Sequence, residues 1–299
     1  YTVKEINCPS YMVQPSSQSI EVKFNSTASA TFENKFKRAD VIFSKVDNET
    51  GDTILANDAV FEIYEYNKNS DSYDTLYGTL DYSASLDSSK YGTSVGYYAT
   101  KLPITSTNEG KYRVVEVKAP TGYVTDTTVY DVVLTDDNSV VKVNDGLIVN
   151  KIQKAQIELT KTDRETGKAV KDAVYGIYAK SDIIANGVLM VSANSKVDTL
   201  MTDENGKATS VNLYLGKYYV KEENAPYGYA LDDTHYDVTL SYDAEKAEVF
   251  TQTSRVSDLP QKATVEVIKK DAETERLIIA PAKYGVYARD DIFVNGDLK

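Results

Sequence analysis

Two stretches of this sequence place a glutamate where an alternating strand should carry an apolar residue. They read KYRVVEVK (111–118) and KYYVKEEN (217–224), and both alternate apolar with polar residues as a strand with one buried face does. Side chains two residues apart share a face of a strand, so the alternation predicts that Glu116 and Glu222 point inward. The chain opens with a third copy, YTVKEINCPSY, in which Glu5 has the corresponding position.

A lysine interrupts an apolar face in three other stretches. They read ADVIFSKVDNETG (39–51), AQIELTKTDRETG (155–167) and ATVEVIKKDAETE (263–275). In each stretch a lysine takes the next position on a face that two apolar residues begin. The predicted inward faces are Val41, Phe43 and Lys45; Ile157, Leu159 and Lys161; and Val265, Val267 and Lys269.

A carboxamide or a carboxyl group ends the apolar face of a third set of stretches. TFENKFKRA, LIVNKIQKA and VSDLPQKA align by their closing basic residue and alanine. The inward pairs are Phe32 and Asn34, Ile148 and Asn150, and Val256 and Asp258. Together, the three sets of stretches predict that each full repeat carries an inward lysine, an inward glutamate and an inward Asn or Asp.

These residue types can form an amide bond when they are buried together. Burial disfavours the charged forms, so the pKa of a lysine falls and that of a glutamate rises. A neutral amine is a nucleophile, and a protonated carboxyl can hydrogen-bond to a neighbouring carbonyl and polarise it. The amine would join an Asn with loss of ammonia, or an Asp with loss of water, while the glutamate shuttles the protons.

The same residues could instead form an ordinary polar network of a lysine, a glutamate and a nearby amide. That interpretation would be preferred for a single inward lysine. Three inward polar positions that recur in register favour the crosslink. They favour it more strongly in the repeat that ends at Asn150 than in the repeat that ends at Asp258.

The three openings are spaced by about 110 residues, which is typical of an independent domain. We therefore expect the end of one repeat in residues 1–38, complete repeats in 39–154 and 155–262, and the start of a further repeat in 263–299. Half of a core cannot stay folded alone, so this order predicts a segment of a longer tandem array.

Each repeat carries β-strand signals throughout. Runs such as AVFEIYEY, YDVVLTDD and YDVTLSYD alternate and are rich in Val and Tyr, with polar turns between them. The Asp-x-Asn-Gly composition of residues 202–208 predicts a tight connection, whereas 181–195 is the one place where a long loop or a short helix is expected. The pattern predicts an all-β fold of tandem two-sheet β-sandwich domains.

The sequence resembles the Cna B-type (SpaA-like) domains of surface adhesins and pilins of Gram-positive bacteria. The resemblance rests on the E-x-x-A-P-x-G-Y box, the K-x-D-x-E-T-G opening, the Y-G-I-Y-A-K-x-D-I run and the terminal Asn or Asp, and it covers nearly the whole chain. It implies prealbumin-like, Ig-like sandwiches that are locked by autocatalytic intramolecular isopeptide bonds.

The resemblance implies specific residues for each bond. The implied triads are Lys45, Glu116 and Asn150, and Lys161, Glu222 and Asp258. Two sets are incomplete, because Glu5 and Asn34 lack a lysine and Lys269 lacks both partners. The first box also departs from the family pattern, since it has Cys8 in place of Ala and lacks the glycine.

Composition narrows the classes of partner. A formal net charge of −12 argues against nucleic acid and anionic membranes, and no apolar run approaches the length of a membrane span. The single cysteine, Cys8, excludes an internal disulfide framework and is expected to fill a small-residue position. We expect no metal and no cofactor, because the acidic stretches DNETGD and LTDDN lack the spacing of a calcium-binding loop. The single histidine, His235, is expected at a strand edge, and no Ser-His-Asp set can be assembled around it.

The leading hypothesis is mechanical. An extracellular stalk anchored to a bacterial cell wall would consist of locked sandwiches, whose partners are the neighbouring repeats of the same chain. A bond between the first and last strands would close a loop of about 100 residues and carry tension directly.

The alternative is an adhesive binding module that contacts a host surface protein or glycan through its loops or a sheet face. The loops differ between repeats, NKNSDSYDTLYG in one and SDIIANGVLM in the next, which favours the stalk. A sortase-assembled pilus shaft is a third hypothesis, without a wall-sorting motif to support it. A turnover enzyme is not expected, because this chemistry happens once and consumes its own residues.

Overall fold

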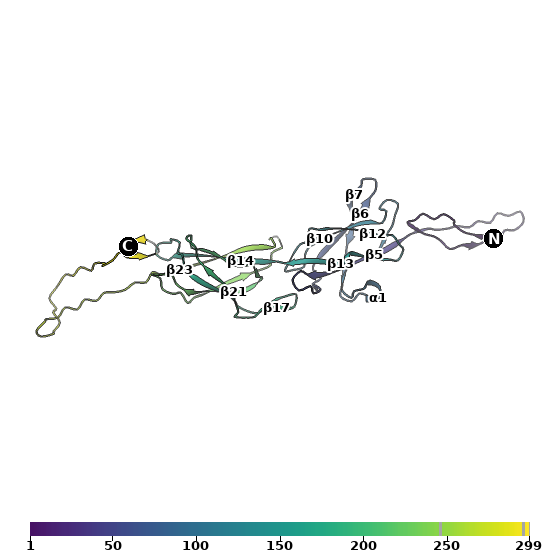
Figure 1. Ribbon diagram of the computed structural model, residues 1–299. Coiled ribbons are helices and arrows are strands. Elements are labelled where there is room, and N and C mark those ends of the chain that lie inside the picture. The colour runs from purple at the N-terminus through teal and green to yellow at the C-terminus, as the bar shows by residue number, and fades with distance from the viewer. Residues whose placement is uncertain (245–246, 295–296, 299) are drawn as a thin grey trace. The chain divides into compact units, whose positions relative to one another are not determined.

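Residues 1–244, 247–294 and 297–298 are described by the structure, a computed structural model whose regular secondary structure is almost entirely β-strand (Figure 1). The chain divides into two compact units. The first unit contains Tyr1–Gln153, Ala185–Val188 and Tyr242–Glu248, and the second contains Lys154–Ile184, Leu189–Ser241 and Val249–Lys299.

Two sheets form the sandwich of the first unit. Their strands are β5 (Arg38–Asp47), β6 (Val60–Asn67), β7 (Ser72–Thr79), β8 (Asp81–Ser83), β9 (Gly96–Pro103), β10 (Lys111–Lys118), β11 (Tyr123–Val124), β12 (Val129–Val133) and β13 (Val140–Ile152). One sheet has the order β12-β10-β6-β7 and the other β11-β13-β5-β9-β8. Phe61 of the first sheet meets Phe43 and Tyr97 of the second at ring-centroid distances of 4.7 and 5.0 Å, so the core lies between the sheets.

The second unit repeats this arrangement. Its strands are β14 (Lys154–Asp163), β15 (Val174–Ala179), β18 (Lys196–Met201), β19 (Lys207–Thr209), β20 (Leu213–Tyr214), β21 (Gly216–Asn224), β22 (His235–Leu240) and β23 (Val249–Asp258). One sheet has the order β18-β15-β21-β22, and the other contains β19-β14-β20 with β23 also paired to β14. His235 lies on β22 at the edge of the first of these sheets, as predicted.

In both units the first strand of the repeat pairs with the last strand in parallel. β13 pairs with β5 on both sides of one register shift, and β23 pairs with β14 along the whole of β14. A parallel pair cannot be closed by a hairpin, so the rest of each repeat lies between these two strands in the sequence. The two ends of each repeat are therefore neighbouring strands of one sheet.

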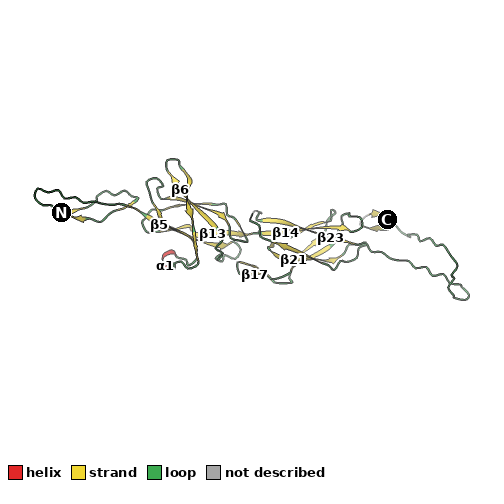
Figure 2. Ribbon diagram, turned by 180° about the vertical axis from the view of Figure 1, so that it is seen from behind, coloured by secondary structure: helices red, strands yellow, loops and turns green. Residues whose placement is uncertain are grey.

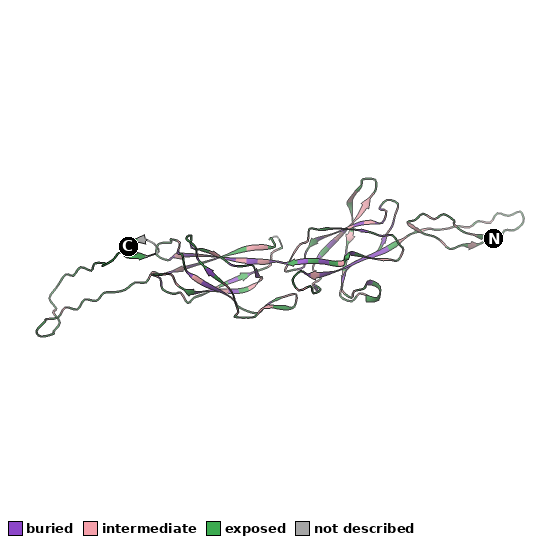
Figure 3. Ribbon diagram, in the orientation of Figure 1, coloured by how far each residue is buried: buried purple, intermediate pink, exposed green. Residues whose placement is uncertain are grey.

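Burial follows the alternation that the sequence predicts. Every second residue of β14 is buried, and on β10 the buried residues are Tyr112, Val114 and Glu116. Figure 3 shows buried segments, in purple, along the strands of both units. The prediction of an all-β fold of two-sheet sandwiches is confirmed.

Residues 181–195 form a β-hairpin, so the expectation of a long loop or a short helix there is wrong. β16 (Ile183–Ala185) pairs with β17 (Val188–Val191). Asn186 and Gly187 connect the two strands with φ angles of 47° and 77°. Positive φ at both central residues is what a two-residue type I′ turn requires, and Asn-Gly is its preferred sequence.

One helix occurs among the described residues, α1 (Ser88–Tyr91), shown in red in Figure 2. Asp87 caps its first turn, and Gly92 ends it in the left-handed conformation. The tight connection predicted at 202–208 is present, and Gly206 adopts a φ of 69° there.

Outside these sheets and the β16–β17 hairpin, the strands of the described residues form three short pairs. They are β1 (Thr2–Val3) with β3 (Gln18–Ser19), β2 (Met12–Val13) with β4 (Lys35–Phe36), and β24 (Phe293–Val294) with β25 (Asp297–Leu298). The inward face predicted at Val265 and Val267 is wrong, because these side chains are 65% and 50% exposed. An apolar strand face is buried only when a second sheet covers it, and no described strand covers this one.

Candidate crosslink sites

In the first unit, Glu116 lies between Lys45 and Asn150. Lys45 Nζ is 3.0 Å from Glu116 Oε1, and Asn150 Nδ2 donates to Glu116 Oε2 at 2.7 Å. Asn150 Nδ2 also donates to the Val124 carbonyl at 2.9 Å. All three site residues are buried. The structure thus brings together the three residues that the sequence predicts at this site.

The two sheets supply these residues from opposite sides. Lys45 on β5 is the register partner of Ile148, and Asn150 follows two residues later on β13. Because side chains two residues apart share a face, Lys45 and Asn150 both point toward the other sheet. Glu116 on β10 points back toward them from that sheet.

The Lys45 amine is poorly satisfied for a buried charge. Burial lowers the pKa of Lys45, and the Glu116 carboxylate opposes this shift only in part. Neither Lys45 Nζ nor Asn150 Oδ1 has a hydrogen-bond partner among the described residues, because the ion pair with Glu116 lacks hydrogen-bond geometry. The Phe61 ring lies 5.0 Å from Nζ. This environment favours the neutral amine, which is the nucleophilic form.

In the second unit, Lys161 lies among three polar groups. Its Nζ donates to the Tyr175 hydroxyl at 2.6 Å, lies 3.3 Å from Glu222 Oε1 and forms an ion pair with Asp258 Oδ1. The side chains of the three charged residues have no exposed surface. Lys161 is the register partner of Val256, so Asp258 follows two residues later on β23.

The Asp258 carboxyl has an acidity unlike that of an exposed aspartate. Burial raises the pKa of Asp258 to about 6 against the opposing effect of Lys161, and the Glu222 carboxylate adds to the rise. A protonated carboxyl can lose water more readily than a carboxylate, so this pKa suits an acceptor in amide formation.

The two incomplete sets behave differently. Asn34 Nδ2 donates to both oxygens of Glu5 at 3.0 Å and lies 3.3 Å from Cys8 Sγ, so this pair is assembled without a lysine. Cys8 is half-buried, which agrees with a small-residue position beside this pair. Lys269 is half-buried and forms no ion pair with any other described residue.

The family model of the SpaA prealbumin-like fold domain matches residues 39–146 and 155–254. The chain belongs to this family. The match confirms the family that the sequence resembles. Lys45, Glu116, Lys161 and Glu222 lie inside the two matched ranges, and both acceptors lie a few residues beyond them.

Three relatives show how this chain compares with known proteins. The trypsin-resistant surface T6 protein of Streptococcus pyogenes serotype M6 is 31% identical over 87 residues, which cover 29% of this chain and 14% of that protein. The structure of the Bacillus anthracis TIE protein has a TM-score of 0.56 at 26% identity and covers 87% of this chain and 42% of that one. A streptococcal ancillary pilin has a TM-score of 0.30 at 20% identity, covering 88% and 75%. The chain thus spans less than half the length of the first two.

A hydrogen bond that the sequence pattern did not predict ties the E-x-x-A-P-x-G-Y box to the opening strand of each repeat. The Tyr123 hydroxyl donates to Asp47 Oδ2 at 2.6 Å, and the Tyr229 hydroxyl donates to Asp163 Oδ2 at 2.7 Å. The other oxygen of each aspartate accepts backbone N–H groups of the following turn. The signal was present in both repeats, because the last Tyr of the box and the Asp of the opening recur together.

In each SpaA domain, an aspartate that the sequence pattern did not single out orients the glutamate. The backbone N–H of Asp126 donates to Glu116 Oε2 at 2.6 Å, and that of Asp232 donates to Glu222 Oε2 at 2.9 Å. The side chains of these aspartates accept from the Tyr130 and Tyr236 hydroxyls. Each glutamate is therefore fixed through the oxygen that does not face the lysine.

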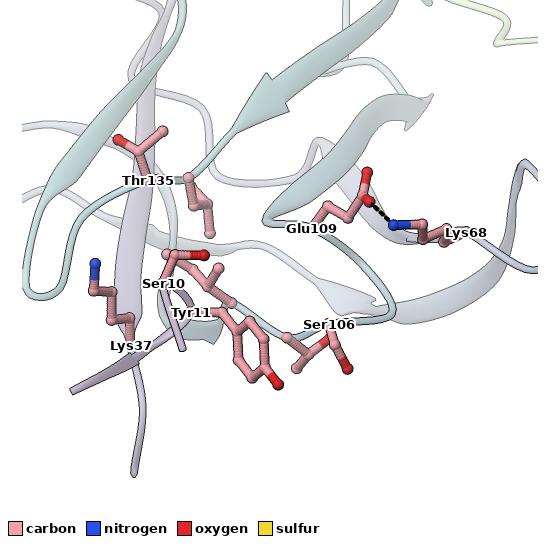
Figure 4. Close-up of a pocket in the computed structure, with 10 residues that line it drawn as sticks. Ser10, Tyr11, Lys37, Lys68, Ser106, Glu109 and Thr135 are labelled. Atoms are coloured by element: carbon pink, nitrogen blue, oxygen red, sulfur yellow. Dashed lines mark ion pairs between the residues drawn. The ribbon is translucent and has the colours of Figure 1, made fainter. Parts of the chain in front are cut away.

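A separate hollow in the first unit carries mixed polar groups (Figure 4). Its volume is about 560 Å³, and Ser10, Tyr11 and Ser106 lie around it. Lys68 and Glu109 pair with each other across 2.5 Å. Because these two charges satisfy one another, the hollow indicates no particular class of ligand.

Among the described residues, no helix is long and apolar enough to span a membrane.

Proposed function

We propose that this chain is a structural part of a bacterial cell-surface protein, in which isopeptide bonds join Lys45 to Asn150 and Lys161 to Asp258. The observation that carries the proposal is that each buried lysine pairs with a glutamate beside an acceptor on the parallel last strand. That acceptor hydrogen-bonds to the glutamate in the first site and pairs with the lysine in the second. In both repeats the acceptor lies two residues after the register partner of the lysine. A lysine–glutamate pair with a purely structural role would not require an acceptor at that position.

In the first site, the Lys45 amine attacks Asn150 Cγ. Glu116 lies within reach of both nitrogens, so it accepts a proton from Nζ and delivers it to the leaving Nδ2. Of the three protons on the Lys45 ammonium, one stays on the new amide and two leave with Nδ2 as ammonium. In the second site the same transfer by Glu222 releases one oxygen of Asp258 as water.

The bonds would give the domains mechanical resistance. Tension enters each repeat on its first strand and leaves on its last, and these strands are parallel neighbours. Pulling parallel neighbours from opposite ends shears their ladder of hydrogen bonds. An amide between them carries the load instead and leaves about 100 residues shielded from extension.

A surface location agrees with a relative whose name records a trypsin-resistant surface protein. Folded, covalently closed domains resist proteases because local opening is suppressed. We therefore propose an extracellular position on the cell wall, with the neighbouring repeats of the same protein as mechanical partners.

The mass of the intact chain under denaturing conditions tests the proposal. The expected mass is lower than the sequence mass by one ammonia and one water. Tryptic peptides should contain Lys45 joined to Asn150 and Lys161 joined to Asp258. An unmodified mass would overturn the crosslinks, and loss of ammonia alone would remove only the Asp258 bond.

A further inference from the structure

The two candidate sites differ at one position that faces the glutamate. Phe61 on β6 is the register partner of Glu116, and Tyr175 on β15 is the register partner of Glu222. Both rings are fully buried and lie over the lysine, with Nζ 5.0 Å from the Phe61 centroid and 5.3 Å from the Tyr175 centroid. The hydroxyl of Tyr175 is therefore a polar group that the first site lacks at this position.

The acceptors of the two sites are held in different ways. Asn150 donates through Nδ2 to both Glu116 and the Val124 carbonyl, so its own hydrogen bonds fix it. Asp258 has no N–H to donate, and neither of its carboxyl oxygens has a hydrogen-bond partner among the described residues. It forms an ion pair with Lys161, whose Nζ is in turn held by the Tyr175 hydroxyl, and it lies near the Glu222 carboxylate.

We propose that Tyr175 is a further catalytic residue of the second site, which fixes the Lys161 amine for attack on Asp258 and so replaces the hydrogen bonds that Asn150 makes for itself. This inference rests on the proposed function of the site. The two repeats differ at two linked positions. The repeat with Phe61 has an amide acceptor, and the repeat with Tyr175 has a carboxyl acceptor.

The geometry gives Tyr175 a definite role in the step. The Lys161 amine must keep one N–H aimed away from the acceptor while its lone pair turns toward Asp258 Cγ. The Tyr175 oxygen, 2.6 Å from Nζ, accepts that N–H. Burial raises the pKa of Tyr175, and the Glu222 and Asp258 carboxylates raise it further, so the hydroxyl stays neutral.

The proton balance does not consume the tyrosine. The step begins from the neutral Lys161 amine and the protonated Asp258 carboxyl. One of the two amine protons stays on the amide nitrogen, and Glu222 carries the other to the Asp258 hydroxyl oxygen, which leaves as water. The C–N bond forms at Asp258 Cγ as that C–O bond breaks. Tyr175 ends the step with its hydroxyl unchanged.

The test follows both bonds during refolding of the full chain. Unreacted chain is isolated unfolded in denaturant and diluted into buffer, and samples are digested at intervals to quantify both crosslinked peptides by mass. We expect Tyr175→Phe to slow the Lys161–Asp258 bond by at least about tenfold, because a hydrogen bond to the reacting amine is lost. The Lys45–Asn150 bond of the same molecules serves as the internal reference and keeps its rate. Tyr178→Phe makes the same chemical change on the opposite face of β15, away from the site, and should leave both rates unchanged.

The acceptor variant separates catalysis from simple stabilisation. In an Asp258→Asn background, the new amide can make its own hydrogen bonds, so Tyr175→Phe should slow bond formation by less than about twofold. An equal slowing in both backgrounds would assign the hydroxyl a purely structural role and overturn the inference. An unchanged rate in Tyr175→Phe alone would overturn it as well, while the proposed crosslink would stand. Absence of the Lys161–Asp258 bond from the unaltered chain would overturn both.

Discussion

Asp258 is the register partner of Asp163 in the parallel ladder between β14 and β23. Asn150 has the same relation to Asp47 between β5 and β13. Each aspartate of the opening strand lies two residues beyond the lysine, so the acceptor in both SpaA domains reaches the lysine from the same offset. The same two aspartates accept hydrogen bonds from the last tyrosine of each E-x-x-A-P-x-G-Y box. The position of the acceptor is therefore linked to the packing of that box.

Glu116→Gln should abolish the Lys45–Asn150 bond in a domain that still folds. The amide keeps the size of the carboxyl but cannot accept a proton from Nζ, so bond formation should slow by about 10²-fold or more. Peptide mapping of the purified chain checks this. The Lys161–Asp258 peptide of the same sample is the control, and normal formation of the Lys45–Asn150 bond would show that Glu116 is not the proton carrier.

Loss of the first bond should expose a new unfolding step under force. Asn150→Ala removes the acceptor and leaves the Lys45–Glu116 ion pair in place, so the fold is disturbed little. Single molecules stretched end to end should then extend by about 100 further residues, each contributing up to ~3.3–3.6 Å. The second domain is the internal control. Extension of the unaltered first domain at similar force, with its crosslink present, would contradict the mechanical proposal.

The two bonds should respond to pH in opposite ways. Asp258 has a pKa of about 6, raised by burial, so its protonated form declines as pH rises through 6 and the Lys161–Asp258 bond should form more slowly. Asn150 does not titrate, and burial lowers the pKa of Lys45, so the Lys45–Asn150 bond should form faster as pH rises toward that pKa. Refolding between about pH 5 and 8 with both peptides quantified measures the ratio. A ratio that does not change with pH would rule out Asp258 protonation as a requirement.

Tyr229→Phe should destabilise the second domain by about 1.5–3 kcal/mol, because the buried Asp163 carboxylate loses a hydrogen bond. The measurement is denaturant unfolding in a Glu222→Gln background, where no crosslink masks the change and the Lys161–Asp258 ion pair remains. Tyr227→Phe is the matched control from the same box, since Tyr227 is 92% exposed. Equal effects of the two substitutions would show that the Tyr229–Asp163 bond contributes nothing.

The sequence alone determines which side chains face inward. Alternation is a local property of an extended chain, and it predicts the burial of Lys45, Glu116 and Asn150 and of their counterparts in the second repeat. The recurrence of these positions at domain spacing also predicts the all-β sandwiches and the SpaA family. The hairpin at 181–195 is predictable too, because Asn186-Gly187 is the preferred sequence of a two-residue hairpin turn.

Only the tertiary structure decides how these side chains meet. Alternation does not say which strands pair, in which direction or at which register, and the offset between Lys45 and Asn150 follows from a parallel pair of strands about 100 residues apart. The contact of Tyr175 with Lys161 depends on the ladder between β15 and β21, and the raised pKa of Asp258 depends on burial by both sheets. Val265 shows the limit of the local pattern: its face alternates correctly, yet it stays exposed because burial requires a second sheet that no described residue supplies there.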